Sequence, residues 1–203
     1  GEQSVRHDTV GLVCLDRGTR WMDGFPAKSR ESEQSYKMLQ KFNGSLKPKN
    51  IFSDGAPELS KACEELGYSH DTCTPHRHQS NGVAERAVRR CKEGTACQMI
   101  QSGFMAAWWC LAMRHYCFLY NVVERCVNRG PEGWLTPYEV RFGPFLSHLI
   151  IPFGAEVSYL PANPEDKAKQ HSTGTRQRSG LMVGYALKNA GEWTGDFLII
   201  DWE

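Results

Sequence analysis

Short β-type runs alternate with helical segments along the first 72 residues, and this alternation limits the possible folds more than any other feature. In order, the pattern predicts a hairpin, a helix, a strand, a second helix and a second strand. The expected ranges are 9–15 and 20–25 for the hairpin, 29–42 and 57–66 for the helices, and 49–53 (buried) and 68–72 for the strands. This order is typical of an α/β layer structure.

Single residues mark the expected boundaries of these elements. We expect the hairpin to close at Pro26, Ser29 to cap the first helix, and Gly44 to end it. Pro57 stands where the second helix should begin, because proline is well suited to a first helical position.

Two longer helices are expected next. Asn81 is a suitable N-cap for a helix that reaches about Ser102. The segment 106–127 is apolar on nearly all sides, which predicts a buried helix. Its Trp108 and Trp109 admit two interpretations, a base-stacking platform or core packing, and large aromatic side chains most often serve the second role.

The C-terminal part, from residue 130 onward, consists of short runs broken by Gly and Pro. Its strands are expected over 149–160, 179–185 and 192–202. A polar stretch over 163–178 is expected to form a mobile loop. We therefore predict two domains, 1–128 and a small β-rich module over 129–203.

Charge is nearly balanced over the 203 residues, with 24 basic and 23 acidic side chains. No global field therefore recruits nucleic acid or a membrane, and any such affinity must come from a local cluster. One cluster stands out, in which Glu85 is the single acid among the basic residues Arg77, Arg86, Arg89, Arg90 and Lys92.

The eight cysteines form no C-x-x-C pair and lie within apolar runs. This placement indicates buried free thiols in a reducing compartment rather than a zinc ribbon or a disulfide framework. The most apolar run, 104–113, is too short to span a bilayer, so we expect a soluble intracellular protein with no membrane partner.

Two acids flank the loop that precedes the basic segment. Asp54 follows the expected strand 49–53, and Glu85 lies one turn into its helix, so both are on rigid elements. Carboxylate oxygens suit Mg²⁺, and two such ions about 3.5–4 Å apart can activate a hydroxyl and stabilise the leaving oxygen of a phosphodiester. Arg89 and Lys92 share a helix face with Glu85, where a bound phosphate would meet them.

A simpler interpretation accounts for the same spacing. Asp54 would cap a turn, Glu85 would pair with Arg89 as an ordinary i,i+4 salt bridge, and the basic residues would form a solvated face. Spacing alone does not separate the two interpretations.

Three motifs then carry a resemblance. They are Ser53-Asp54-Gly55-Ala56-Pro57-Glu58, Thr74-Pro75 and Gln79-Ser80-Asn81-Gly82-Val83-Ala84-Glu85-Arg86. Together they resemble the core of retrovirus-like integrases, especially those of copia-type LTR retrotransposons. Segments outside the core are similar to the same family: 12–28, Trp108-Trp109, Thr136-Pro137-Tyr138-Glu139, Phe142-Gly143 and Ser179-Gly180-Leu181-Met182-Val183-Gly184-Tyr185.

The resemblance implies an α/β, RNase H-like fold followed by an SH3-like β module, and a DD(E) polynucleotidyl transferase that uses two Mg²⁺ or Mn²⁺ ions. Such enzymes trim the ends of an element and join them to target DNA, so the implied partners are DNA and further copies of the chain. A nuclear location or a retrotransposon particle is implied as well. By position, Asp54 matches the second catalytic aspartate and Glu85 the catalytic glutamate. The nucleic-acid contacts are then expected from Arg86, Arg89 and Lys92, and from Gln79 and Asn81 in the flexible active-site loop.

The chain departs from the family pattern in two ways. Asp54 and Glu85 are 31 positions apart, fewer than is usual in the family, and a trimmed surface segment would explain this. The first catalytic aspartate, on the first of three antiparallel strands in the family, has no counterpart here, because only two such runs precede Ser29. We expect that strand to lie upstream of Gly1 or to be lost, with Asp8 and Asp16 as the candidates to replace its acid.

Without a third carboxylate two divalent ions would bind weakly, so we expect little strand-transfer activity from this chain alone. A rival hypothesis is a non-catalytic nucleic-acid-binding or capsid-associated module that keeps the fold and the basic helix. A structure-specific nuclease on the same fold is a third hypothesis, and nothing in the acid pattern selects it.

Overall fold

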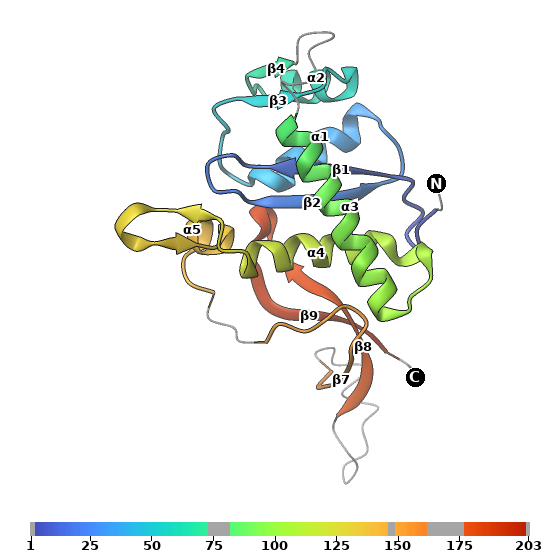
Figure 1. Ribbon diagram of the computed structural model, residues 1–203. Coiled ribbons are helices and arrows are strands. Elements are labelled where there is room, and N and C mark those ends of the chain that lie inside the picture. The colour runs from blue at the N-terminus through green and yellow to red at the C-terminus, as the bar shows by residue number, and fades with distance from the viewer. Residues whose placement is uncertain (1–2, 73–81, 146–148, 162–176, 202–203) are drawn as a thin grey trace.

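The computed structural model describes residues 3–72, 82–145, 149–161 and 177–201 (Figure 1). Its strands are β1 (Val10–Leu15), β2 (Met22–Ala27), β3 (Ile51–Ser53), β4 (His70–Thr72), β5 (Val127–Asn128), β6 (Trp134–Leu135), β7 (Glu156–Tyr159), β8 (Arg178–Leu187) and β9 (Trp193–Asp201). Its helices are α1 (Ser32–Asn43), α2 (Pro57–Glu65), α3 (Gly82–Ser102), α4 (Trp109–Val123) and α5 (Pro137–Phe142), with 3-10 turns η2 (Ala106–Trp108), η3 (Gly130–Glu132) and η4 (Asn189–Gly191).

The first two strands form the expected antiparallel hairpin. Val10 pairs with Ala27 and Leu15 with Met22, over six residues of each strand. The prediction that the hairpin closes at Pro26 was wrong, since Pro26 lies inside β2 opposite Gly11. A proline is tolerated there because, among the described residues, β2 pairs with β1 alone and is an edge strand.

The helix α1 begins three residues later than its predicted start. Glu31, not Ser29, is the N-cap residue, and its side chain makes no capping bond. The hydroxyl of Thr9 donates to the Lys28 carbonyl at 2.8 Å, so the chain leaves the hairpin still extended before the helix can begin. The predicted end is confirmed, because Gly44 adopts a φ of 60° and its N–H donates to the Gln40 carbonyl.

The strands β3 and β4 are parallel and are joined by α2, which begins at Pro57 as predicted. Ile51 packs with the buried side chains of α1 and α2, namely Leu39, Ala62 and Cys63. The expectation of a fully buried strand was wrong, because the side chain of Phe52 is 43% exposed. Successive strand residues face opposite ways, and the helices cover only the face that carries Ile51.

The hairpin and the β3–β4 pair form separate sheets in the part of the chain that the structure describes. No backbone hydrogen bond there joins β1 to β3, although Cys14 of β1 packs against the cluster that contains Ile51. The two strand pairs therefore share α1 as a common packing partner rather than a continuous hydrogen-bonded ladder (Figure 1).

The helices α3 and α4 pack closely against each other. Ala87, Cys91 and Thr95 line the buried face of α3, and a Cβ atom added at Gly94 would lie 2.0 Å from the ring of Tyr116 on α4. On the hairpin side, Asn121 of α4 binds both backbone groups of Met22, at 2.9 and 2.7 Å. The two helices thus hold the hairpin in place.

The apolar segment 106–127 is not one helix. Its first residues form η2, and α4 ends at Val123 instead of residue 127. Val127 is buried in β5, where it pairs with Leu135, so apolar character continues past the end of the helix. Trp108 and Trp109 are half-buried and pack against the core, in agreement with the core-packing interpretation.

The C-terminal strands β7, β8 and β9 form one antiparallel sheet in that order. Only Glu156–Tyr159 of the predicted run 149–160 is a strand, and the predicted mobile loop lies mostly outside the described residues. Aromatic side chains join this sheet to the rest of the chain in a single cluster that contains Trp21, Phe118, Tyr138 and Tyr185.

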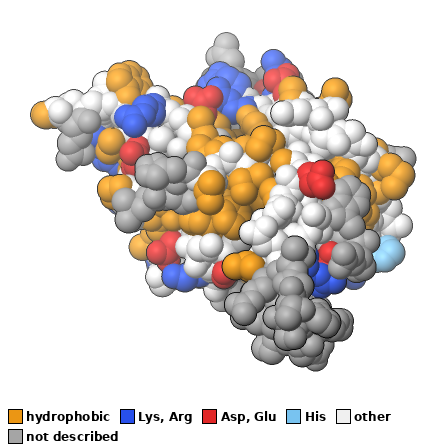
Figure 2. Space-filling model, turned by 90° about the horizontal axis from the view of Figure 1, so that it is seen from below, with side chains coloured by type: hydrophobic (Ala, Val, Ile, Leu, Met, Phe, Trp, Pro, Cys, Tyr) orange, Lys and Arg blue, Asp and Glu red, His pale blue; other side chains and the backbone are white. Residues whose placement is uncertain are grey.

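One face of the molecule is notably apolar. Figure 2 shows hydrophobic side chains gathered across its centre when it is seen from below. Among the described residues of the C-terminal part, the large apolar side chains that are exposed are Trp134, Leu149, Ile150, Leu160 and Leu198.

Candidate functional site

Asp54 follows β3 directly and its side chain is exposed. The turn here is held by its neighbour: the Gly55 N–H donates to the Ser53 hydroxyl at 3.3 Å, and that hydroxyl lies 2.9 Å from Nε2 of His70. The Asp54 carboxylate has no hydrogen bond or ion pair with any described residue. The interpretation that Asp54 caps this turn therefore has no support in the structure.

Glu85 lies in the first turn of α3 and is exposed as well. Within the described ranges no cation lies within 4.0 Å of its carboxylate, so the i,i+4 salt bridge with Arg89 is not formed. Both predicted metal ligands thus have free carboxylates. In Figure 1 the first turn of α3 and the β3–β4 pair lie toward the same end of the molecule.

Three of the predicted nucleic-acid contacts, Arg86, Arg89 and Lys92, are exposed on α3. They lie opposite the face that packs on α4, because Ala87 and Cys91 are buried at the alternate positions of the helix. The other two predicted contacts, Gln79 and Asn81, lie outside the described residues.

Arg90 has a different role from its basic neighbours. Its guanidinium lies over the ring of Tyr120, 5.3 Å from the centroid, and so it contributes to the contact between α3 and α4. Burial is the main reason why the pKa of Tyr120 is raised, to about 12, and the positive charge of Arg90 opposes this shift. Arg90 is exposed like Arg86, Arg89 and Lys92, and its contact with Tyr120 is what distinguishes it from them.

Neither candidate for the missing acid is free to replace it. Asp16 accepts hydrogen bonds from the Gly18 N–H at 2.8 Å and the Thr19 hydroxyl at 2.7 Å, which hold the turn between β1 and β2. Asp8 is buried and accepts from the Ser4 hydroxyl at 2.9 Å. Among the residues that the structure describes, no group of three His, Cys, Asp or Glu side chains is placed to hold a metal ion.

Sequence reasoning missed a second group of charged residues around the buried Asp23 on β2. Arg114 of α4 lies 3.9 Å from the Asp23 carboxylate. Burial raises the pKa of Asp23, while the positive charges of Arg114 and Arg141 lower it. Asp23 and Arg114 are 91 positions apart, so the sequence alone offers no signal for this pair.

Arg141 of α5 is the third member of this group and is partly buried. Its guanidinium lies over the rings of Trp21, Phe42 and Phe142 at 5.2 to 5.7 Å, and it donates to the Phe42 carbonyl at 2.6 Å. Burial lowers its pKa, and Asp16 and Asp23 oppose that shift. Arg141 fixes α5 to α1 and the hairpin.

The described cysteines are all free thiols. Cys91 and Cys117 lie 3.6 Å apart, sulfur to sulfur, in the contact between α3 and α4. The hydrogen bond with Cys91 and burial raise the pKa of Cys117, so this thiol is held neutral. Cys91 and Cys117 act as packing residues. The prediction of buried thiols was wrong for Cys97, which is exposed.

Comparison with solved structures finds chains of similar fold. A chain of the simian T-cell lymphotropic virus intasome, solved in complex with the PP2A regulatory subunit B56 gamma, matches 95% of this chain and 70% of its own length, with a TM-score of 0.53 and 17% identity. The BIV integrase catalytic core domain matches 64% of this chain and 83% of its own, with a TM-score of 0.46 and 21% identity. The HTLV-2 integrase catalytic core domain, in complex with magnesium, matches 63% and 81%, with a TM-score of 0.48 and 19% identity.

The predicted mixed α/β architecture is confirmed, and the fold is similar to that of the intasome chain over nearly the whole length of this chain. In sequence, the chain is 29% identical over 151 residues to the Gag-Pol polyprotein of avian reticuloendotheliosis virus. The match covers 70% of this chain but only 12% of that polyprotein. No protein-family model matches the sequence.

None of the described helices combines the length and the apolar character that crossing a bilayer would require.

Proposed function

We propose that this chain is the core of a DD(E) polynucleotidyl transferase that integrates the DNA of an LTR retrotransposon by 3′-end processing and strand transfer. The observation that supports this most is the pair of free, exposed carboxylates, Asp54 and Glu85, on an integrase-like fold. Neither is used by a turn or a salt bridge in the described residues, which leaves both available to a ligand. The similarity to a Gag-Pol polyprotein supports the same reading.

The two carboxylates suit a hard divalent ion such as Mg²⁺ or Mn²⁺. When bound at Asp54 and Glu85, such ions would activate the attacking oxygen and stabilise the leaving oxygen of a phosphodiester. Arg86, Arg89 and Lys92 would bind the phosphates of the DNA beside these acids, because all three are exposed on the same helix as Glu85. Gln79 and Asn81 would add contacts from the preceding segment.

Two acids alone hold two divalent ions weakly, so the site needs a further ligand. We propose that a further extended segment, which carries an aspartate, lies beside β1 and β3 in space and fills the gap between the two strand pairs. Supporting this, the two strand pairs form separate sheets in the described residues, and Cys14 of β1 still packs against the cluster around Ile51 of β3. Such a segment would pair with both strands and bring its acid to the end of β3 where Asp54 begins.

At a larger scale we propose two domains, a core over 1–128 and an SH3-like module over 129–203, joined by the shared aromatic cluster around Phe118. The protein would act on DNA as a homo-oligomer, in the nucleus or in a retrotransposon particle of the copia type. These assignments extend the sequence resemblance.

A second candidate is a non-catalytic nucleic-acid-binding module derived from an integrase core. The absence of a third metal-ligand side chain near Asp54 and Glu85 in the described part of the chain favours it. The exposed basic residues of α3 would serve this function without any ion.

Titration with Mn²⁺ by calorimetry separates the two candidates. The enzyme proposal expects two-site binding, weak in the present chain, that disappears in Glu85→Gln and in Asp54→Asn. The binding module expects salt-dependent DNA binding that neither substitution changes and that Arg89→Gln weakens. DNA binding without any Mn²⁺ binding would contradict the enzyme proposal.

Strand transfer by the chain alone is the second readout, and we expect it to be low. Strand transfer with Mg²⁺ should be lost in Asp54→Asn and retained in the matched control Asp16→Asn, whose carboxylate holds a turn. Efficient joining of DNA by this chain, stopped by Asp54→Asn but not by Asp16→Asn, would show that the proposed extended segment with its aspartate is dispensable. The proposal of that segment would then fail.

A further inference from the structure

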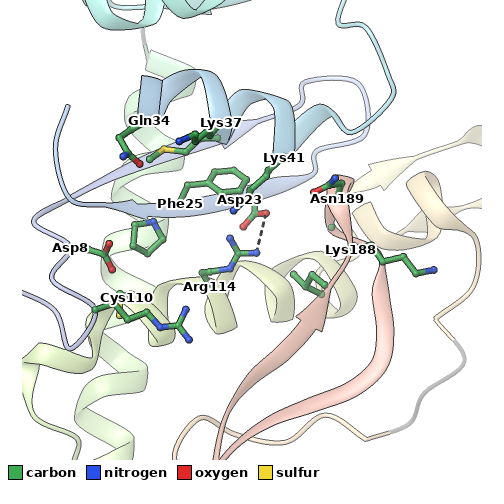
Figure 3. A pocket seen from close by; sticks show the side chains of 15 residues that line it. Asp8, Asp23, Phe25, Gln34, Lys37, Lys41, Cys110, Arg114, Lys188 and Asn189 are labelled. Atoms are coloured by element: carbon green, nitrogen blue, oxygen red, sulfur yellow. Dashed lines mark ion pairs between the residues drawn. The ribbon is translucent and has the colours of Figure 1, made fainter. Parts of the chain in front are cut away.

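A pocket of about 360 Å³ lies between α1, β2, α4 and the connection from β8 to β9 (Figure 3). None of the residues that line it belongs to β3, and none comes from α3. The pocket is therefore separate from Asp54 and Glu85. Its walls come from both proposed domains, because Arg114 of α4 and Lys188 at the end of β8 both line it.

Positive charge dominates the lining of this pocket. Its five basic residues are Arg6, Lys37, Lys41, Arg114 and Lys188. Its two acidic residues are Asp8 and Asp23. The whole chain carries a formal net charge of only +1, so this surplus of cations is a local feature.

The basic residues of the pocket differ in whether they form an ion pair with another residue. Lys37 pairs with Glu33 at 2.5 Å, and Lys188 pairs with Glu192 at 3.0 Å, so both are engaged at the rim. Arg6 and Lys41 have no ion pair with any residue in the described ranges. Two cations thus line the pocket without a protein counter-ion.

Arg114 is a third cation of the pocket, and it already contacts two other side chains. It lies over the ring of Phe25 at 5.4 Å from the centroid, and its distance to Asp23 is a long 3.9 Å. Figure 3 shows Arg114 rising from α4 toward Asp23 beneath α1. The ring and the carboxylate hold the guanidinium in place, and a guanidinium has donors to spare for an anion.

We propose that this pocket binds a small diphosphate, either inorganic pyrophosphate or the diphosphate group of a nucleotide. The unpaired side chains of Arg6 and Lys41, together with the spare donors of Arg114, suit a compact anion with several negative charges, such as a diphosphate. The volume is at the lower end of the range of about 300–1,000 Å³ for small-molecule sites. Walls from five segments suit a compact ligand rather than the backbone of a duplex.

Calorimetric titration with sodium pyrophosphate, without divalent metal, tests the proposal on the full chain. We expect one site, which weakens about 5- to 10-fold in Lys41→Gln and in Arg6→Gln, because each loses one charge-assisted contact. The matched control is Lys47→Gln, an exposed lysine just beyond α1 that does not line the pocket and should leave affinity unchanged. All of these side chains are exposed and unpaired, so the variants should fold, and circular dichroism checks this.

Titration with ADP separates the sources of the diphosphate. Binding of ADP at least as tight as that of pyrophosphate assigns a nucleotide, and binding of pyrophosphate alone assigns the inorganic ion. The proposal is overturned if no pyrophosphate binds below about 10 mM, or if Lys47→Gln weakens binding as much as Lys41→Gln. It is also overturned if only duplex DNA binds in a Lys41-dependent manner, which would make this face a nucleic-acid surface.

This inference does not rest on the proposed function. Asp54→Asn should abolish Mn²⁺ binding and leave pyrophosphate binding unchanged, so the two proposals fail separately.

Discussion

The hairpin β1–β2 and the parallel pair β3–β4 are both two-stranded, yet they are supported very differently. The hairpin pairs over six residues on each strand, and β2 is buried along nearly its whole length against α4. The parallel pair has three residues on each strand and leaves Phe52 43% exposed. The candidate acid Asp54 follows the lightly supported pair, while Glu85 lies on α3, which is anchored on α4 and the hairpin.

This difference shows how the two halves of the candidate site are built. Glu85 has a rigid position supplied by packing, whereas Asp54 depends on three ladder pairs and one packed face. A ligand that binds both acids would therefore stabilise β3–β4 far more than α3, since local stability follows local packing.

Removal of the Phe118 ring from the shared aromatic core should lower the free energy of unfolding more than the other substitutions. Phe118 on α4 is 2% exposed and lies 4.2 Å, centroid to centroid, from the ring of Tyr185. We expect Phe118→Ala to lower the free energy of unfolding by about 3–5 kcal/mol, because it leaves a cavity in the shared core. Urea denaturation followed by tryptophan fluorescence measures this loss.

The matched variant in the other region is Phe52→Ala, for which we expect a loss below about 1 kcal/mol because much of the ring is already in water. Equal losses in the two variants would mean that β3–β4 is packed as firmly as the core around Phe118.

A pH effect should come from His115, which is 1% exposed in the same core. Its ring lies between the Gln98 side chain and the Ile151 carbonyl, at 3.2 and 3.0 Å. Burial lowers the pKa of His115 to about 4, although the bond to Ile151 opposes this shift. The folded chain therefore keeps the imidazole neutral over a range in which the unfolded chain, with a pKa of about 6.5, takes up a proton.

Stability from this group is fully present above about pH 6.5 and falls as the pH is lowered toward 4, by about 3 kcal/mol in total. Urea titrations at pH 7.5, 5.5 and 4.5 measure the fall, and His115→Gln should flatten it. An unchanged pH slope in His115→Gln would assign the acid sensitivity to other groups.

A substitution in the contact between α3 and α4 should have the next largest effect on the free energy of unfolding. Because a Cβ atom at residue 94 would meet the Tyr116 ring at 2.0 Å, Gly94→Ala should lower the free energy of unfolding by about 1–3 kcal/mol despite the better helix propensity of alanine. Thermal unfolding monitored by circular dichroism measures it. Glu93→Ala, an exposed neighbour on the same helix, is the control and should change stability by less than about 0.5 kcal/mol.

The elements were largely predictable from the sequence, because their signals are local. Alternation in the hairpin, Pro57 at the start of α2 and Gly44 at the end of α1 all describe chemistry within a few residues. The end of α4 was not predictable from periodicity, because the apolar run continues to Val127, which is buried by a strand instead of a helix. Tertiary packing decides such boundaries.

For the sites, predictability followed the same rule. Asp54 and Glu85 could be proposed as site residues from the sequence because each stands at an element boundary within a motif, and their role stays a prediction. The basic pocket was not found, because Arg6, Lys41, Arg114 and Lys188 come from four segments spread over most of the chain. Only folding brings them together.

The smallest expected effect is the most informative about the two acids. We expect Asp54→Asn and Glu85→Gln each to change the free energy of unfolding by less than about 0.5 kcal/mol, because both side chains are exposed and have no partner among the described residues. Asp16→Asn is the contrasting variant, since its carboxylate holds the Gly18 N–H and the Thr19 hydroxyl, and we expect it to cost about 1 kcal/mol.

Urea denaturation with and without Mn²⁺ provides the measurement. Replacing an acid that stabilises the fold by its amide should lower the free energy of unfolding, whereas the same replacement at an acid that serves only to bind a ligand should not. If Asp54→Asn destabilised the metal-free chain as much as Asp16→Asn does, Asp54 would be part of the fold, and its assignment as a metal ligand would lose its main support. If the substitution is neutral without metal and removes the stabilisation by Mn²⁺, the lightly supported β3–β4 pair is stabilised by the ligand it binds.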